Sequence, residues 1–349
     1  MKVGIVGFRG SGKTTVFNAL TGLHAEVGGF HGEESKNLGI IKVPDERLLK
    51  IHDAVKPKKL VQAEIAFADL AAASPASGKG FSPKTLAEMR VADALVHVVR
   101  GFDNPEVSED ADLRRDVERF ESEMALADLI VVENRLERMR KQGAKGQERD
   151  LLEELKLHLE QELPIRTFPL TEDAKGRLAG FTFLSEKPCL VLLNVSEGEA
   201  ASAAPANVAE MAKARGLRLL VISGQVEMEL NELDDAERAE YLASLGLTTT
   251  AKNRFIREAY DMLELIAFFT FGPDEVRAWP IRKGTRAQQA AGKIHSDIER
   301  GFIRAEVMQW QDVVALPHES KLREAGKIKL EGKEYIPQDG EVIHFRFNV

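Results

Sequence analysis

The sequence contains few of the residues and segments that mark secreted, membrane or nucleic-acid-coating proteins. Its one cysteine, Cys189, cannot form an internal disulfide, and its place in the apolar run PCLVLLN predicts a buried side chain. The first apolar run stops at Arg9, which is too early for a secretion signal or a membrane span. A formal net charge of −8 argues against a protein that coats nucleic acid with positive charge. We therefore expect a cytoplasmic protein without a membrane segment.

The 349 residues are too many for one hydrophobic core, since single cores stop growing near roughly 250 residues. Short apolar runs recur along the chain and end in polar or glycine-containing turns: KVGIVGF, AEIAFADL, ADALVHVVR, PCLVLLNV and LRLLVISG. Helical patterns separate most of them, as in a parallel sheet with crossover helices. The sequence thus predicts an α/β domain formed by residues 1–110 and 187–265.

The segment 111–186 interrupts this rhythm with long charged helices. Apolar residues recur there at spacings of three and four: Leu113, Val117, Phe120, Met124, Ala127 and Val131. After the turn-like KQGAKGQ, Leu152, Leu155 and Leu159 continue the stripe. The pattern predicts an inserted antiparallel helical hairpin whose stripe is packing rather than a binding groove.

Residues 266–349 change to short strand patterns, which predicts a separate α+β domain. The expected strands are EVRAWPI, FIRAEV, KIKL, KEYIP and VIHFRFNV, with one helix around TRAQQAAGKIHSDIERG. Between Arg277 and Arg304 there are seven basic and two acidic residues, a net of +5. This basic segment is either a contact for RNA or a solvated face whose charge is balanced elsewhere in the fold.

A phosphate-binding loop follows the first apolar run. Gly7, Gly12, Lys13 and Thr14 fit the pattern G-x-x-x-x-G-K-[ST] between a strand and a helix, which is the context this motif requires. Backbone N–H groups bind the phosphates, Lys13 stabilises the β and γ oxygens, and the Thr14 hydroxyl is a ligand for Mg²⁺. Asp69, at the end of AEIAFADL, is the expected second metal ligand.

The run LVLLNVSE places Asn194 and Glu197 after a buried strand, where a nucleotide base can be recognised. Readers of guanine end the matching pattern in aspartate, and glutamate is one methylene longer. With N-x-x-E in this place, the chain resembles the Obg-like ATPases of the YchF subfamily, which prefer ATP. Similar segments are VFNALTG, VPDERL, ADALVHVVRGFDNP and, above all, the C-terminal EVRAWPIRKGTRAQQAAGKIHSDIERGFIRAEV and AGKIKLEGKEYIPQDGEVIHFRFNV.

The resemblance covers nearly the full length and implies an Obg-type P-loop domain, a helical hairpin and a C-terminal TGS domain of β-grasp fold. It also implies ATP with Mg²⁺, and association with ribosomes or translation. The expected nucleotide contacts are Arg9, Gly10, Ser11, Gly12, Lys13, Thr14, Thr15, Asn194, Val195, Glu197, Ser223 and Gly224. The match at the last two is looser, since the family usually has alanine and lysine after the serine, where this chain has Gly224 and Gln225.

Departures from the family pattern fall on the parts that support hydrolysis. The family's loop usually begins with an asparagine that helps to hold potassium, and Gly10 stands there, so whether potassium or a partner completes the site stays open. The family's D-x-A-G is Asp69, Leu70, Ala71 and Ala72, so the glycine that senses the γ-phosphate is replaced.

The first switch also differs, because no threonine lies between Leu23 and Val43. A metal contact from this loop would come from Glu33, Glu34 or Ser35. His31 is interpreted as a solvated loop residue rather than a base, and His97, inside ALVHVVR, as a packed strand residue.

Two classes of function are consistent with these observations. The first is a switch that hydrolyses ATP slowly and moves the hairpin and C-terminal modules against a ribosomal or RNA partner. The second is a non-catalytic adaptor whose nucleotide is a structural ligand. Glu197 disfavours a third interpretation, a GTP-binding protein. The altered switches predict that ATP binding is retained better than turnover, and the oligomeric state is left open.

Overall fold

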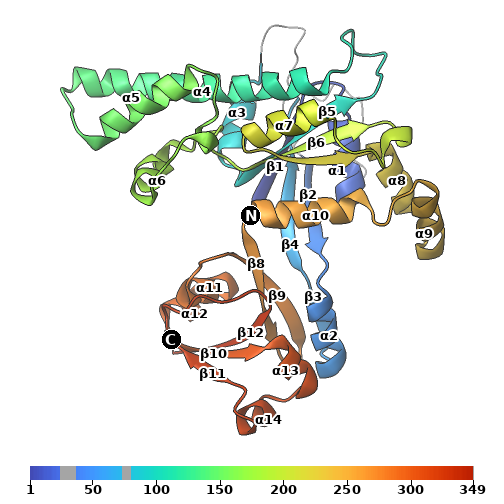
Figure 1. Cartoon of the computed structure of the whole chain (residues 1–349). Coiled ribbons are helices and arrows are strands. Elements are labelled where there is room, and N and C mark those ends of the chain that lie inside the picture. Colours follow the sequence, from blue (N-terminus) through green and yellow to red (C-terminus); the bar gives the residue numbers. More distant parts are fainter. Residues whose placement is uncertain (24–36, 73–79, 349) are drawn as a thin grey trace. The chain divides into compact units, whose positions relative to one another are not determined.

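A computed structural model describes residues 1–23, 37–72 and 80–348 (Figure 1). The chain forms two compact units: Met1–Gly39 with Ala66–Met262, and Ile40–Ile65 with Leu263–Val349. The sequence pattern predicts residues 40–65 in the nucleotide domain. They cluster with the second unit because α2 (Glu46–Val55) buries Leu48 and Ile51 in its core and β3 (Lys59–Val61) pairs with β9 (Glu275–Arg282).

The first sheet has the strand order β2-β4-β1-β5-β6-β7. Its strands are β1 (Lys2–Gly7), β2 (Asn37–Val43), β4 (Ala63–Asp69), β5 (Ala94–Gly101), β6 (Cys189–Val195) and β7 (Arg218–Ile222). Strand β1 pairs in parallel with β4 and β5, and β5, β6 and β7 continue the parallel array. The apolar runs therefore form the predicted parallel sheet, whose carboxyl ends meet at one edge.

Helices lie on both faces of this sheet. One face carries α3 (Pro83–Arg90), α4 (Leu113–Lys141) and α7 (Ala206–Ala214), which share a core with β5 and β6. On the other face, α10 (Ala251–Met262) packs Phe255 against Phe67 with ring centroids 5.2 Å apart. Helix α1 (Lys13–Thr21) packs on α8 (Gly224–Glu232), which α9 (Asp235–Ser244) follows along the chain.

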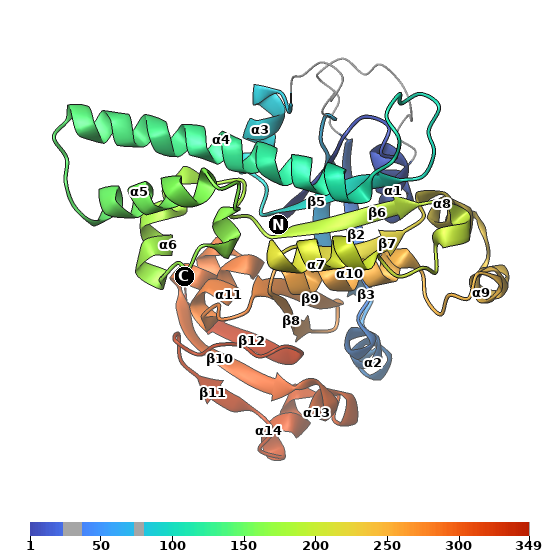
Figure 2. The ribbon, with the colours of Figure 1, turned by 45° about the horizontal axis from the view of Figure 1, so that its top comes forward.

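Helix α4 is long enough to leave the sheet and pair with α5 (Gln147–Leu159), and Figure 2 shows this hairpin projecting beyond β5. Leu152, Leu155 and Leu159 are buried, as predicted. On α4 the predicted Val117, Phe120 and Met124 are buried, and the predicted Leu113, Ala127 and Val131 are partly buried against the hydrophobic cores. Ala125, Val132 and Met139 are also buried, because the first turns of α4 pack on the sheet and the later turns pack on α5.

The segment between the hairpin and β6 holds α6 (Glu172–Leu178) and two 3-10 turns, Ile165–Thr167 and Ala179–Phe181. Buried Asp128 of α4 fastens this segment to the hairpin. Its carboxylate accepts hydrogen bonds from Leu184 N (2.9 Å), Ser185 N (2.7 Å) and Ser185 Oγ (2.8 Å), and it faces Arg90 at 3.1 Å. Burial raises the pKa of Asp128, and the three hydrogen bonds oppose that shift.

The second unit is the predicted α+β domain. Its sheet has the order β11-β10-β12-β8-β9-β3, with β8 (Leu265–Phe271), β10 (Phe302–Gln309), β11 (Lys329–Glu331) and β12 (Glu341–Phe347). The β8–β9 and β10–β12 pairs are antiparallel. One core joins this sheet to α11 (Ala287–Ile294) and α12 (Ser296–Arg300) and a second joins it to α2, α13 (Trp310–Ala315) and α14 (Glu319–Glu324).

Two local predictions in this unit are wrong. KEYIP forms no strand, because the oxygens of Lys333 and Tyr335 accept hydrogen bonds from Gln288 N and Ala287 N at the start of α11 instead of pairing in a sheet. The single predicted helix is two, because His295 is extended and its Nδ1 accepts from Asp297 N at 3.1 Å, starting a new helix.

Candidate nucleotide-binding site

The phosphate loop connects β1 to α1 and has the shape that an anion-binding turn requires. Gly10 and Gly12 are in the left-handed region, with φ of 79° and 75°, and Ser11 N donates to Phe8 O at 3.2 Å. Gly12 is the N-cap of α1 and has no side chain to occupy the first N–H groups of the helix. Those groups and the positive end of the helix dipole are therefore available to a phosphate.

Close neighbours also require these two glycines. A Cβ on Gly10 would lie 2.3 Å from Val107 Cγ2, and one on Gly12 would lie 2.3 Å from Asn194 Nδ2. Both distances are far inside van der Waals contact. The loop is thus packed between the segment after β5 and the end of β6.

The side chains of Lys13, Thr14 and Asp69 meet beside this loop. Asp69 ends β4, in register with Ile5 of β1, so its carboxylate reaches the start of α1. Its Oδ1 pairs with Lys13 Nζ, and its Oδ2 accepts from Thr14 Oγ1 at 3.3 Å. A hydroxyl and a carboxylate are hard oxygen donors, so this set fits Mg²⁺.

Leu70, Ala71 and Ala72 continue from Asp69. Leu70 is buried and its N–H donates to Ile5 O at 3.0 Å, whereas the two alanines are exposed. The first-switch residues His31, Glu33, Glu34 and Ser35 lie outside the described residues.

Asn194 ties three segments together. Its Nδ2 donates to Ser11 O at 3.0 Å, its Oδ1 accepts from Gly224 N at 2.9 Å, and its side chain is buried. Both polar groups of the amide are thus hydrogen-bonded within the protein. Asn194 therefore holds the phosphate loop and the start of α8 in place at the border of the site. Ser223 Oγ accepts from Val226 N at 3.4 Å and caps α8.

Glu197 lies just beyond, on the exposed 3-10 turn Glu197–Glu199, and half-buried Val195 ends β6. Because β6 and β7 are adjacent and parallel, the loops holding Glu197 and Gly224 lie at the same edge of the sheet. The structure therefore brings together the phosphate loop and both predicted base-side loops.

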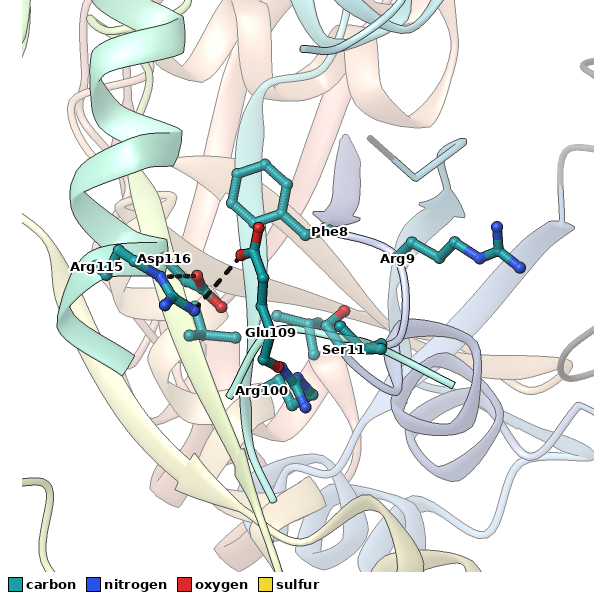
Figure 3. Close-up of a pocket in the computed structure, with 10 residues that line it drawn as sticks. Phe8, Arg9, Ser11, Arg100, Glu109, Arg115 and Asp116 are labelled. Atoms are coloured by element: carbon teal, nitrogen blue, oxygen red, sulfur yellow. Dashed lines mark hydrogen bonds and ion pairs between the residues drawn. The ribbon is translucent and has the colours of Figure 1, made fainter. Parts of the chain in front are cut away.

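The loop after β5 supports the phosphate loop on its other side, through a contact that the sequence pattern does not predict. Asn104 Nδ2 donates to Gly10 O at 3.2 Å, and Arg100 donates to Glu109 O. A small cavity lies between this loop and the start of α4; Figure 3 shows Glu109, Arg115 and Asp116 around it, with the Arg9 side chain pointing away. The turn-forming residues DNP, 103–105, are the one sequence feature that could have predicted an ordered loop at this position.

His97 and Cys189 have the packing roles that the sequence predicted. The His97 ring is fully buried and stacks on Phe120 with centroids 4.1 Å apart, and burial lowers its pKa to about 3. Burial raises the pKa of the Cys189 thiol to about 12. Neither side chain is suited to proton transfer or nucleophilic attack at neutral pH.

Part of the basic segment 277–304 is compensated inside the second unit. Arg277 pairs with Glu275 at 3.3 Å and lies over the Trp279 ring, Arg286 pairs with Glu334 at 2.7 Å, and Arg300 pairs with Asp297. The exposed cations of the segment also include Lys283, Lys293 and Arg304.

A strand, a glycine-containing loop and a helix that begins at Lys13, with Thr14 and Asp69 beside it, define a P-loop NTPase. The family models agree: residues 2–135 match a 50S ribosome-binding GTPase, and residues 265–348 match YchF-GTPase_C, described as a protein of unknown function. The chain is 39% identical to the ribosome-binding ATPase YchF of Bacillus subtilis, with 100% of both chains covered. It is 38% identical to the protein of that name from Escherichia coli O157:H7, covering 100% of this chain and 99% of that one.

The structure of the Schizosaccharomyces pombe YchF GTPase matches 99% of this chain and 97% of its own, at 31% identity and a TM-score of 0.83. The chain therefore belongs to the YchF family, and the predicted α/β architecture with a C-terminal α+β domain is confirmed. Among the described residues, no helix is long and apolar enough to cross a membrane.

Proposed function

We propose that this protein binds ATP with Mg²⁺ and acts as a slowly hydrolysing, ribosome-associated switch. The observation that carries the proposal is the meeting of the left-handed phosphate loop, Lys13, Thr14 and Asp69 at one edge of the sheet. Lys13 would stabilise phosphate oxygens, and Thr14 and Asp69 would hold the metal, directly or through water. The metal would supply neutralisation of phosphate charge.

The preference for ATP is supported by Glu197 and by the bacterial relatives, whose names call them ATPases. Guanine presents two adjacent N–H donors, which a short aspartate carboxylate can face together. Glutamate carries its carboxylate one methylene further. The Schizosaccharomyces pombe relative is titled a GTPase, so GTP binding is the alternative to be measured against ATP.

Slow hydrolysis is supported by the altered residues around the γ-phosphate position. Phosphoryl transfer depends on positioning and charge stabilisation. A site with Gly10 in place of the family's asparagine and Ala72 in place of its glycine should therefore hydrolyse ATP more slowly while it still binds the nucleotide. If the rate of hydrolysis fell to zero, the protein would be the non-catalytic adaptor. The retained Lys13, Thr14 and Asp69 favour the switch.

The partner is proposed to be the ribosome, since the bacterial relatives are named ribosome-binding ATPases. The exposed cations Lys283, Lys293 and Arg304 are suited to RNA phosphates, and the hairpin of α4 and α5 is the second candidate contact. We assign the C-terminal unit to the TGS class and the protein to the cytoplasm on the same family basis.

The decisive experiment is calorimetric titration of nucleotide-free protein with ATP and GTP in Mg²⁺, followed by phosphate release from the same sample. Lys13→Ala should abolish tight binding, whereas Lys213→Ala, at an exposed position on α7, should leave it unchanged. Release that depends on Lys13 supports the switch, and tight binding without release, even with ribosomes present, supports the adaptor. A wild-type protein without ATP affinity would refute the proposal.

The base argument and the partner have their own tests. Glu197→Asp should shift the preference from ATP toward GTP, and an unchanged preference would show that Glu197 does not read the base. Co-sedimentation with ribosomes should depend on salt and weaken when Lys283, Lys293 and Arg304 are replaced together by glutamine.

A further inference from the structure

Four side chains, the proposed base-reading residue Glu197 among them, form a hydrogen-bonded network that no sequence pattern predicts. Tyr241 Oη lies 2.5 Å from Glu229 Oε2 and 3.1 Å from Glu197 Oε1, and Gln225 Nε2 donates to Glu229 Oε1 at 3.1 Å. The network runs from the turn after β6, through α9, to the first turn of α8. It therefore connects the two loops that border the proposed base site.

Tyr241 is well placed to hold this network. Its ring packs with Leu233, Leu242 and Leu245 on a small core, so its position is fixed by apolar contacts while its hydroxyl reaches solvent-exposed carboxylates. Helix α9 begins with a capping box formed by Asp234 and Glu237, which anchors the helix that carries it. Hydrogen bonding to Glu229 raises the pKa of Tyr241, so the hydroxyl stays protonated and remains a donor at neutral pH.

From these contacts we propose that Tyr241 is a specificity-determining residue, which holds Glu197 Oε1 and so restricts that carboxylate to recognition of adenine. This inference rests on the proposed function of the site. With Oε1 engaged, Glu197 Oε2, which has no hydrogen-bond partner in the described part of the chain, accepts one N–H from the 6-amino group of adenine. Guanine needs both carboxylate oxygens for its N1–H and 2-amino donors.

Glu229 sets the strength of this restriction. The Tyr241 hydroxyl has one proton, which both carboxylates accept in a shared hydrogen bond, Glu229 at 2.5 Å and Glu197 at 3.1 Å, so the bond to Glu197 is the longer and weaker branch. Replacing Glu229 by glutamine introduces an amide that can donate to Tyr241 Oη. The hydroxyl proton would then be directed to Glu197.

Two substitutions should therefore move nucleotide preference in opposite directions. Tyr241→Phe keeps the ring packing and frees Glu197, so the ratio of the Kd for GTP to the Kd for ATP should fall about tenfold, the effect of one hydrogen bond to a charged group. Glu229→Gln should raise that ratio. Ser244→Ala removes only the bond from Ser244 Oγ to Tyr241 O, 2.7 Å, and should leave the ratio unchanged.

The measurement is competitive calorimetry with ATP, GTP and inosine triphosphate on the full-length variants in Mg²⁺. Inosine keeps N1–H but lacks the 2-amino group, so Tyr241→Phe should improve GTP binding more than binding of inosine triphosphate. If the wild type prefers ATP and the ratio is the same in Tyr241→Phe, the role of Tyr241 is refuted while the proposed function stands. If the wild type binds no nucleotide, the proposed function fails and this inference fails with it.

Discussion

Replacing Asn194 by alanine should destabilise the first unit even without nucleotide, because this side chain is a structural tie. The substitution removes the bond to Ser11 O at 3.0 Å and the bond from Gly224 N at 2.9 Å. Each buried peptide group left without a partner costs about 1–3 kcal/mol. We expect a loss of about 3 kcal/mol in the free energy of unfolding, which corresponds to a fall in Tm of roughly 6–12 °C for a unit of this size.

The assay is thermal and urea unfolding of the nucleotide-free variant, followed by circular dichroism. Asn207→Ala is the matched control, since Asn207 is exposed on α7 in the same unit, and it should change stability by less than about 0.5 kcal/mol. A loss in Asn194→Ala no larger than in this control would show that the side chain does not hold the three segments together. Because nucleotide is absent, the result does not depend on the proposed function.

Three substitutions at closely packed positions of the first unit should change its stability. The folded His97 ring stays neutral down to about pH 3 while the unfolded chain takes up a proton near pH 6.5, so stability is lost as pH falls through this window. His97→Phe should reduce the pH dependence of the free energy of unfolding by about 1.4 kcal/mol per pH unit, measured by urea unfolding at pH 6.5 and 5.0. An equal pH dependence in wild type and variant would show that His97 is not the group responsible. Gly10→Asn should lower Tm because Val107 occupies the space for its side chain, and adding Val107→Ala should recover part of the loss. Asp128→Ala leaves two buried N–H groups and the Ser185 hydroxyl unpaired and should cost about 3–5 kcal/mol, seen as faster hydrogen exchange in α4; unchanged exchange would exclude the anchor role.

Features carried by local pattern could be predicted from the sequence. The phosphate loop needs only a strand, the glycines at its ends, and Lys13 and Thr14 in order, and Asp69 follows from the carboxyl end of the adjacent apolar run. The hairpin follows from helical spacing on both sides of the turn KQGAKGQ, where α4 ends at Lys141 and α5 begins at Gln147. These signals depend on neighbours within a few turns of the chain.

Contacts between distant segments could not be predicted. Asn194 lies 183 positions after Ser11 in the chain, and Asn104 lies 94 positions after Gly10, so no periodicity indicates that their amides meet those peptide oxygens. The same limit applies to residues 40–65. A strand of three residues is too short for its sequence to predict which sheet it joins. Strand β3 pairs with β9, which lies more than two hundred positions later in the chain.

The two asparagines give a physical reason for the proposal that this chain retains nucleotide binding better than turnover. Asn104 holds Gly10 O and Asn194 holds Ser11 O, so adjacent peptide oxygens of the phosphate loop are bonded within the protein, while the N–H groups at the start of α1 remain for phosphate. A loop held in this way loses little conformational entropy when nucleotide binds. Ala71 and Ala72, which depart from the family pattern at the place where the resemblance expects contact with the γ-phosphate, are exposed and lie outside this bonded frame. Changes there should therefore lower the rate while the frame preserves affinity.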